Sequence, residues 1–329
     1  MVLPSTMHVI EMSGAGGPEV LVRAERPVPV PQPGQVVVKV AYAGVNGPDL
    51  MQRRGLYPAP EGASDLLGLE VSGEVVAIGE GATRWKPGDQ VCALTNGGGY
   101  AQYCAILEEH CLPLPQGLEL AAAASLPEAY FTIWSNIFIA ARLRSQEVFL
   151  VHGGAGGLGT AAVQLGKAFG ARVVVTDHPA ERCAVPAALG ADRVIDYEQE
   201  DFVEVVRAEF GGADVILDIV GGPYIQRNMK AARHDARIVQ LAFALGSKVQ
   251  VDLMPVMLKR LHYTGSTLRS RSDAFKGEVA RQLEAQVWPL FASGGLKSVV
   301  ETILPLQEAA QAHQLMERAA HRGKIVLQA

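Results

Sequence analysis

The chain has 329 residues, of which 49% are hydrophobic and 19% charged, and this apolar content excludes wholesale disorder. A formal net charge of −5, with both signs interspersed, excludes the basic surface that nucleic acid requires. The longest apolar stretches fall well short of the roughly 20 residues that span a bilayer, so no membrane helix is expected.

The start of the chain, Met1 to Met12, lacks the basic segment and long apolar run of a secretory signal, so we expect a cytoplasmic protein. Four cysteines stand at irregular spacings in a chain large enough to fold without disulfides, which indicates reduced and mostly buried thiols. The length favours two domains over a single core.

The first third of the chain predicts a compact β body. Residues 8–40 form short extended segments broken by glycine and proline, and the last of them is Gln35–Val40. Further strands are expected at 71–78, 90–94 and 100–106, separated by turn residues.

The pattern changes near residue 120, where alanine-rich stretches at 120–126 and 129–141 predict helices. Strands then alternate with helices, which is typical of a doubly wound parallel sheet covered on both faces. The expected strands are 148–151, 172–176, 193–195, 215–219 and 237–241, and the expected helices are 158–169, 180–189 and 202–210. Helices at 255–261 and 275–291 and a strand at 324–327 complete the prediction.

A glycine-rich segment, Gly-Gly-Ala-Gly-Gly-Leu-Gly at 153–159, joins the first of these strands to its helix. Gly154, Gly156 and Gly159 fit G-x-G-x-x-G in the context that binds a dinucleotide pyrophosphate. We expect the first of the three to make the tight turn, the second to admit the phosphates and the third to allow close helix packing. The alternative is a glycine-rich turn without a ligand.

Asp177 follows the next expected strand, where a carboxylate accepts hydrogen bonds from a ribose 2′-OH and repels a 2′-phosphate. Taken alone, this favours NADH over NADPH. One alternative is that Asp177 caps the helix at 180–189. Another is that the nearby Arg182 meets a phosphate.

Several motifs, in order along nearly the whole chain, resemble the zeta-crystallin-like quinone oxidoreductases of the medium-chain dehydrogenase/reductase superfamily. The motifs that carry this resemblance are Asn46–Gly55 with Tyr57-Pro58, Leu67–Gly73, Lys86–Asp89, Pro127–Ala129, the loop at 153–159, Leu268–Arg271 and Gly323–Leu327.

The resemblance implies an α/β protein with a GroES-like, β-rich catalytic domain from residues 1–122 and 265–329. A Rossmann nucleotide-binding domain is then expected at 123–264, with the active cleft between the two. It also implies an NADPH- or NADH-dependent reductase of quinones or other conjugated carbonyls and alkenes, assembled as a homodimer or homotetramer. Because relatives that prefer NADPH carry a small residue where Asp177 stands, both nucleotides are retained as the cofactor.

Zinc alcohol dehydrogenases of the same superfamily have a cysteine where this chain has Asn46 and a histidine where it has Leu69. Leucine cannot bind zinc, and an asparagine amide is a poor substitute for a thiolate. No zinc site is therefore expected. Without a metal to stabilise an alkoxide, a conjugated acceptor that spreads negative charge is the expected substrate.

By resemblance, Asn46, Tyr57 and Asp49 line the substrate side as catalytic residues. Asn46 is expected to bind an acceptor carbonyl or the ribose, and Tyr57 to orient the acceptor or donate a proton. The structural alternatives are a turn for Asn46, a helix cap for Asp49 and a packing ring for Tyr57.

The residues expected to contact the cofactor come from two sources. The glycine motif and the strand after it give Gly154, Ala155, Gly156, Gly157, Leu158, Gly159, Asp177 and Arg182, and the resemblance adds Thr132, Tyr197, Phe243, Leu268 and Lys324. Thr132 alternatively bonds a backbone carbonyl, and Tyr197 alternatively packs on the surface. His152, just before the glycines, is interpreted as a buried strand end rather than a catalytic base.

Two further functions remain open. One is a zinc-free enoyl-thioester reductase, and the other is a nucleotide-binding protein without turnover, as in crystallin recruitment.

Overall fold

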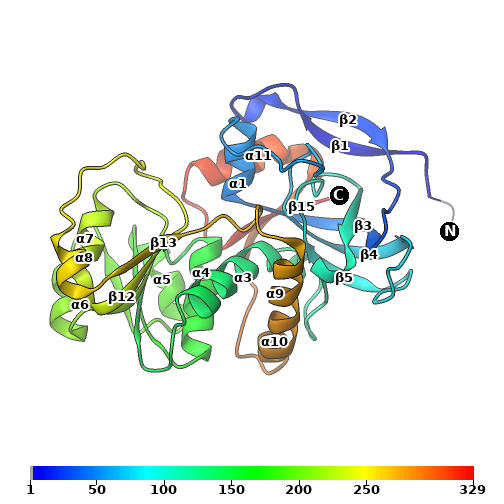
Figure 1. Ribbon diagram of the computed structural model, residues 1–329. Helices are drawn as coiled ribbons and strands as arrows, with labels where there is room; N and C mark the ends of the chain where they lie inside the picture. The colour runs from blue at the N-terminus through cyan, green and yellow to red at the C-terminus, as the bar shows by residue number, and fades with distance from the viewer. Residues whose placement is uncertain (1–2) are drawn as a thin grey trace. The chain divides into compact units, whose positions relative to one another are not determined.

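The computed structural model describes residues 3–329, and the chain divides into two compact units (Figure 1). The central unit runs Thr132–Leu268, and the terminal unit comprises the chain up to Phe131 and from Arg269 onward. The domain boundaries expected from the sequence remain a prediction. Within residues 3–329, no helix combines the length and the apolar composition needed to cross a bilayer.

The terminal unit is built on a β-sheet with the strand order β14-β15-β3-β4-β5-β7, in which β6 also pairs with β3. Its strands are β3 (Gln35–Val45), β4 (Glu70–Ile78), β5 (Gln90–Leu94), β6 (Tyr103–Leu107), β7 (Cys111–Pro113), β14 (Val300–Pro305) and β15 (Lys324–Gln328). Strands β1 (Thr6–Met12) and β2 (Leu21–Pro27) precede this sheet in the chain and pair with each other as an antiparallel hairpin. The β body expected from the first third of the chain is confirmed, and β15 brings residues from the far end of the chain into the same sheet.

Helices of the terminal unit are α1 (Gly47–Arg53), α2 (Leu120–Ala123), α3 (Pro127–Ile133, ending in the central unit), α9 (Asp273–Gln286), α10 (Trp288–Ala292) and α11 (Ala309–Glu317). Valines that alternate along β3 and β4 form the core with the buried side of α11, where Ala309 and Ala312 are fully buried. Burial of this apolar surface is what holds α11 against the sheet.

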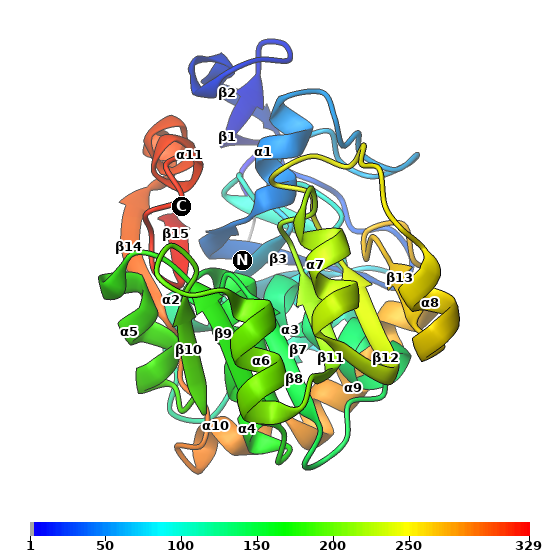
Figure 2. The same cartoon turned by 90° about the vertical axis from the view of Figure 1, so that its left-hand side faces the viewer.

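The central unit contains a wholly parallel sheet in the order β10-β9-β8-β11-β12-β13 (Figure 2). Its strands are β8 (Val148–His152), β9 (Arg172–Asp177), β10 (Arg193–Asp196), β11 (Ala213–Asp218), β12 (Ala232–Gln240) and β13 (His262–Gly265). Every residue of β8 is buried, as expected for a strand in the middle of a sheet covered on both faces.

Helices of the central unit form two groups. Helices α4 (Gly157–Ala168) and α5 (Ala180–Ala188) contact each other, β8, β9 and β10. Helices α6 (Phe202–Phe210), α7 (Tyr224–Ala231) and α8 (Met254–Lys259) contact one another and β11 or β12. The doubly wound architecture predicted from the alternation of strands and helices is therefore confirmed.

Two predicted helices are interrupted. The helix expected at 275–291 ends at Gln286 and restarts as α10, because Pro289 in the first turn of α10 has no N–H to continue the earlier helix. The stretch expected as one helix at 129–141 is α-helical only to Ile133 and then π-helical over Trp134–Ala140. A wider turn of this kind is common at functional sites.

Candidate functional site

The glycine turn follows β8 and leads directly into α4. Gly153 has a φ of +77°, a conformation that only glycine adopts easily, and its N–H donates to the Thr176 carbonyl at 2.9 Å. The tight turn is thus made by Gly153, and the expectation that Gly154 makes it is wrong. Gly154 instead allows close packing, since a Cβ there would lie 2.1 Å from Cγ1 of Val175 on β9.

The surroundings of the other two motif glycines are compatible with the roles expected of them. A Cβ on Gly159 would lie 2.1 Å from the Gly153 carbonyl oxygen, so only glycine lets α4 approach the turn this closely. A Cβ on Gly156 would meet no atom nearer than 3.8 Å, so the space beside it is open. With Gly157 and Leu158 beginning α4, unpaired N–H groups of the first helical turn border this space, and this cradle fits a dinucleotide pyrophosphate.

Asp177 ends β9 with a side chain that is buried and fully engaged. One carboxylate oxygen, Oδ2, accepts the N–H of Ala155 at 2.7 Å, and the other, Oδ1, accepts the N–H of His178 at 2.9 Å. Arg182 forms an ion pair with Oδ1 at 2.8 Å. The alternative role as a helix cap is not supported, because the N-cap of α5 is Pro179. Asp177 therefore connects the glycine turn to Arg182.

Other expected cofactor residues lie elsewhere in the central unit. Tyr197 and Phe243 are 40% and 45% exposed, so both rings are open to a ligand. The Tyr197 ring lies 5.5 Å from that of His178. Leu268 and Thr132 are buried, and the Thr132 carbonyl accepts the Asn136 amide at 2.9 Å.

His152 is buried at the end of β8, and its ring packs edge-to-face against the rings of Phe202 and Tyr224. Its ring nitrogens contact the Thr176 hydroxyl and the Asn228 amide oxygen, each at 2.8 Å, and the Asn228 amide donates to Asp218 at 2.9 Å. Burial is the main cause of a lowered pKa for His152. This satisfied network favours the structural interpretation.

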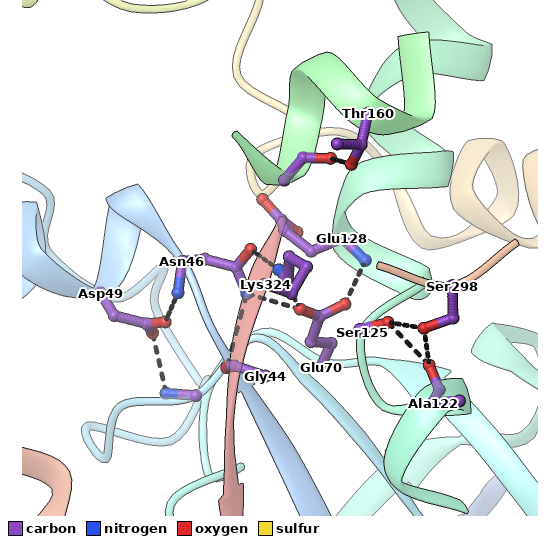
Figure 3. Close-up of polar contacts among 12 residues, drawn as sticks. Gly44, Asn46, Asp49, Glu70, Ala122, Ser125, Glu128, Thr160, Ser298 and Lys324 are labelled. Atoms are coloured by element: carbon purple, nitrogen blue, oxygen red, sulfur yellow. Dashed lines mark hydrogen bonds and ion pairs between the residues drawn. The ribbon is translucent and has the colours of Figure 1, made fainter. Parts of the chain in front are cut away.

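In the terminal unit, a group of polar side chains surrounds the ammonium of Lys324 at the start of β15 (Figure 3). We call Asn46, Glu70, Glu128 and Lys324 the lysine cluster. The Lys324 ammonium contacts the Asn46 amide oxygen and the Glu70 carboxylate, both at 2.5 Å, and the Asn46 amide donates to Glu70 at 2.9 Å. The main-chain N–H of Glu128 donates to the second Glu70 oxygen at 2.9 Å.

The lysine cluster holds a buried ammonium ion beside Asn46. Lys324 is only 4% exposed, and two of the three N–H groups of its ammonium are accounted for by Asn46 and Glu70. A buried cation is thus fixed beside Asn46, while the neighbouring Leu69 side chain has no atom able to bind a metal. In residues 3–329, no group of three or more His, Cys, Asp or Glu side chains is arranged to hold a metal ion.

Glu128 stands at the first turn of α3, and burial near Glu70 raises its pKa to about 8, an effect that the charge on Lys324 partly offsets. Glu128 and Glu70 were not among the residues singled out from the sequence. Both lay inside motifs that were used only for the resemblance. The available signal was an acidic residue within an otherwise apolar run, Leu67-Gly68-Leu69-Glu70-Val71.

Asp49 has a structural environment. It is fully buried and accepts the N–H groups of Asn46 at 2.8 Å and Gly68 at 3.0 Å. Asn46 is the N-cap of α1, and the Asp49 side chain, in the first turn, closes the capping box. Burial raises its pKa to about 6, against the effect of these two hydrogen bonds. This geometry favours the helix-cap alternative over a place on the substrate side.

Tyr57 is partly exposed, and its ring lies 5.5 Å from the guanidinium of Arg269. Arg269 is held in place by the Gln52 side chain at 2.7 Å and by the Asn96 carbonyl. The ring is therefore positioned by a cation, and its partial exposure is compatible with orienting an acceptor.

Comparison with known proteins agrees with the two-part architecture described above. The family described as "Alcohol dehydrogenase GroES-like domain" matches residues 32–116, and that described as "Zinc-binding dehydrogenase" matches residues 157–285. A quinone oxidoreductase of Mus musculus is 30% identical over 98% of this chain and 97% of its own length.

Two other relatives extend the comparison. A phthioceranic/hydroxyphthioceranic acid synthase of Mycobacterium tuberculosis is 32% identical over 90% of this chain, which corresponds to 14% of the synthase. The crystal structure of the Escherichia coli quinone oxidoreductase complexed with NADPH has a TM-score of 0.89, with 29% identity over 98% of this chain and all of that one. The chain therefore belongs to the quinone oxidoreductase family of the medium-chain dehydrogenase/reductase superfamily and is an NAD(P)H-dependent oxidoreductase.

Proposed function

We propose that this protein is a zinc-independent reductase that delivers hydride from NADPH or NADH to a quinone or another conjugated carbonyl or alkene. The observation that carries the proposal is the lysine cluster. Where zinc alcohol dehydrogenases have a metal-binding cysteine, this chain has Asn46, and its amide oxygen binds the ammonium of Lys324. A fixed ammonium polarises an acceptor oxygen less strongly than zinc does, so the acceptor must itself delocalise charge.

Each residue has a distinct part in this scheme. When bound, the nicotinamide nucleotide supplies the hydride. The N–H groups after Gly156 would hold its pyrophosphate, Tyr197 would lie beside its adenosine, and Phe243 would approach it from the later strands of the central sheet. Lys324 directs its remaining N–H toward the negative charge that develops on the acceptor or toward the cofactor. Asn46 would act by holding the Lys324 ammonium in place. Tyr57 would orient the acceptor, and Thr132 would face the nicotinamide.

The acceptor is tested by following the loss of NADPH or NADH absorbance with 1,4-benzoquinone, 9,10-phenanthrenequinone and 2-alkenals. We expect oxidation of at least one nucleotide by quinones or alkenals and none by simple aldehydes. Failure of every acceptor with both nucleotides would contradict the proposal. Stoichiometric zinc in the purified protein by elemental analysis would contradict its zinc independence.

An enoyl thioester is the second candidate acceptor, supported by the 32% identity to a segment of the phthioceranic/hydroxyphthioceranic acid synthase. Crotonyl-CoA in the same assay separates the two. A kcat/KM for crotonyl-CoA that exceeds the values for all quinones and alkenals would favour the thioester. Tight nucleotide binding with no turnover of any acceptor would instead indicate a binding protein.

A further inference from the structure

Glu128 differs from the rest of the lysine cluster in having an unengaged side chain. In the part of the chain that the structure describes, its carboxyl group has no hydrogen-bond or ion-pair partner, and Figure 3 draws only its main-chain N–H in a contact. Lys324 forms no ion pair with it, because the ammonium is held by Asn46 and Glu70, and its charge only partly offsets the rise in the pKa of Glu128.

A main-chain hydrogen bond fixes the position from which the Glu128 side chain extends. The N–H of Glu128 donates to Glu70, and Glu70 is fully buried and held by Lys324. A Cβ on Gly44 of β3 would lie 2.0 Å from the Glu70 carboxylate. The absence of a side chain at position 44 therefore makes room for the Glu70 carboxylate. The main chain of Glu128 is therefore anchored to Glu70 beside the cation. The residue as a whole is partly exposed, but its carboxyl group is largely buried.

The charges around Glu128 favour its neutral form. Burial and the charge of Glu70 are the largest causes of a raised pKa, and Asp49 raises it further. The charges of Lys324 and Arg269 lower it. The result is a pKa of about 8, so the side chain is mostly a protonated carboxylic acid at neutral pH. An acid with a pKa near the working pH is suited to donate a proton in a reaction step.

We propose that Glu128 is the proton donor that completes reduction of a conjugated acceptor at the lysine cluster, an inference that rests on the proposed function. The β-carbon of an enone accepts the hydride, and the electron pair of the C=C bond moves toward the carbonyl as an enolate. The O–H bond of Glu128 then breaks, a C–H bond forms at the α-carbon, and the carboxylate regains a proton from water. Hydride and proton together account for the two hydrogens added.

The experiment compares wild type with Glu128→Gln, which keeps the size of the side chain and removes its acidic proton. With a 2-alkenal, we expect kcat to fall about 100-fold, a typical effect of losing a general acid. Wild-type kcat should fall above pH 8, and this decline should vanish in the variant. The Kd for NADPH, from its fluorescence, should change less than about threefold. Glu119→Gln, an exposed glutamate before α2, is the matched control.

A second measurement needs no turnover. Infrared difference titration of the nucleotide-free protein should show a protonated carboxyl band that disappears near pH 8 in wild type and is missing in Glu128→Gln. Full activity of Glu128→Gln with an unchanged pH profile, or no such band in wild type, would overturn the inference alone. A wild type inactive with all acceptors would overturn the proposed function as well.

Discussion

Two glycines of the same turn have different space around their α-carbons, and this predicts different variant behaviour. Gly156→Ala adds a Cβ into open space, so stability should be unchanged while the added methyl obstructs the pyrophosphate. Gly159→Ala forces a Cβ against backbone of the turn, so it should lower both nucleotide affinity and the free energy of unfolding, the latter by about 1–3 kcal/mol. Urea unfolding and NADPH titration of both variants test this. Equal stability losses would contradict the assignment.

Asp177 permits a prediction about cofactor choice. Its carboxylate is paired with Arg182, so Asp177→Ser removes the negative charge that would repel a 2′-phosphate and keeps the positive charge of Arg182 nearby. We expect the ratio of kcat/KM for NADPH to that for NADH to rise about tenfold, the size of one charge-assisted hydrogen bond.

The exposed Glu181→Gln on the same helix is the control for general charge effects. An unchanged ratio in Asp177→Ser would rule out a selective role for Asp177. Because Asp177 also binds the N–H of Ala155, both nucleotides should bind somewhat more weakly in this variant.

For single residues, sequence patterns located the glycine motif but not the long-range contacts of the other site residues. The spacing of Gly154, Gly156 and Gly159 identified the motif, because each position has a steric requirement. The contact between Asn46 and Lys324 joins residues 278 positions apart, and no local pattern encodes it. The engagement of Asp49 by Gly68 depends on tertiary packing in the same way.

Helices α1 and α11 are linked through a buried histidine, and this link should make stability depend on pH. His313 contacts the Arg53 guanidinium at 3.2 Å and the Tyr100 hydroxyl at 3.0 Å. Burial and the charge of Arg53 lower its pKa to about 3. In the unfolded chain a histidine gains its proton near pH 6.5, so this contribution to stability is present above pH 6.5 and is lost as pH falls toward 3.

Replacement by a neutral side chain tests that link. We expect His313→Gln to be less stable than wild type at pH 7.5 and the difference to shrink by pH 5. Urea unfolding at both pH values measures it, with the exposed His8→Gln as control. A difference that stays constant with pH would contradict the assignment.

Among the elements, those with strong periodicity were predicted and those with mixed character were not. Strands β8 and β9 were recognised because both of their faces are buried and apolar. Helix α7 escaped because it is rich in polar residues, and β14 because its alternation is short and ends at Pro305. Strand β13 is exposed along its length, so it lacks the apolar run that marks a buried strand.

For the whole molecule, the exposed edge at β13 predicts self-association. β13 ends the central sheet, and nearby Met254, Met257 and Leu258 are each more than half exposed. An open edge beside apolar side chains favours pairing with a second copy across a two-fold axis. Strand β12 is paired on both sides, which leaves β13 as the edge.

Light scattering at micromolar concentration should therefore give the mass of a dimer or tetramer. Met257→Glu should shift the mass toward the monomer, whereas Val30→Glu, at an exposed site in the terminal unit, should not. A monomeric wild type would contradict the prediction.

The position of Lys324 on β15 has a consequence for how the protein is made. β3 is synthesised early, but its antiparallel partner β15 follows only after the entire central unit has been translated. At about 5–20 residues per second, the edge of β3 that receives β15 waits on the order of tens of seconds for its neighbour. During that interval Glu70 lacks its counter-ion, Lys324. The nascent chain then contains a nearly complete central unit and a terminal sheet in which the edge of β3 has no partner and is able to pair with a wrong strand.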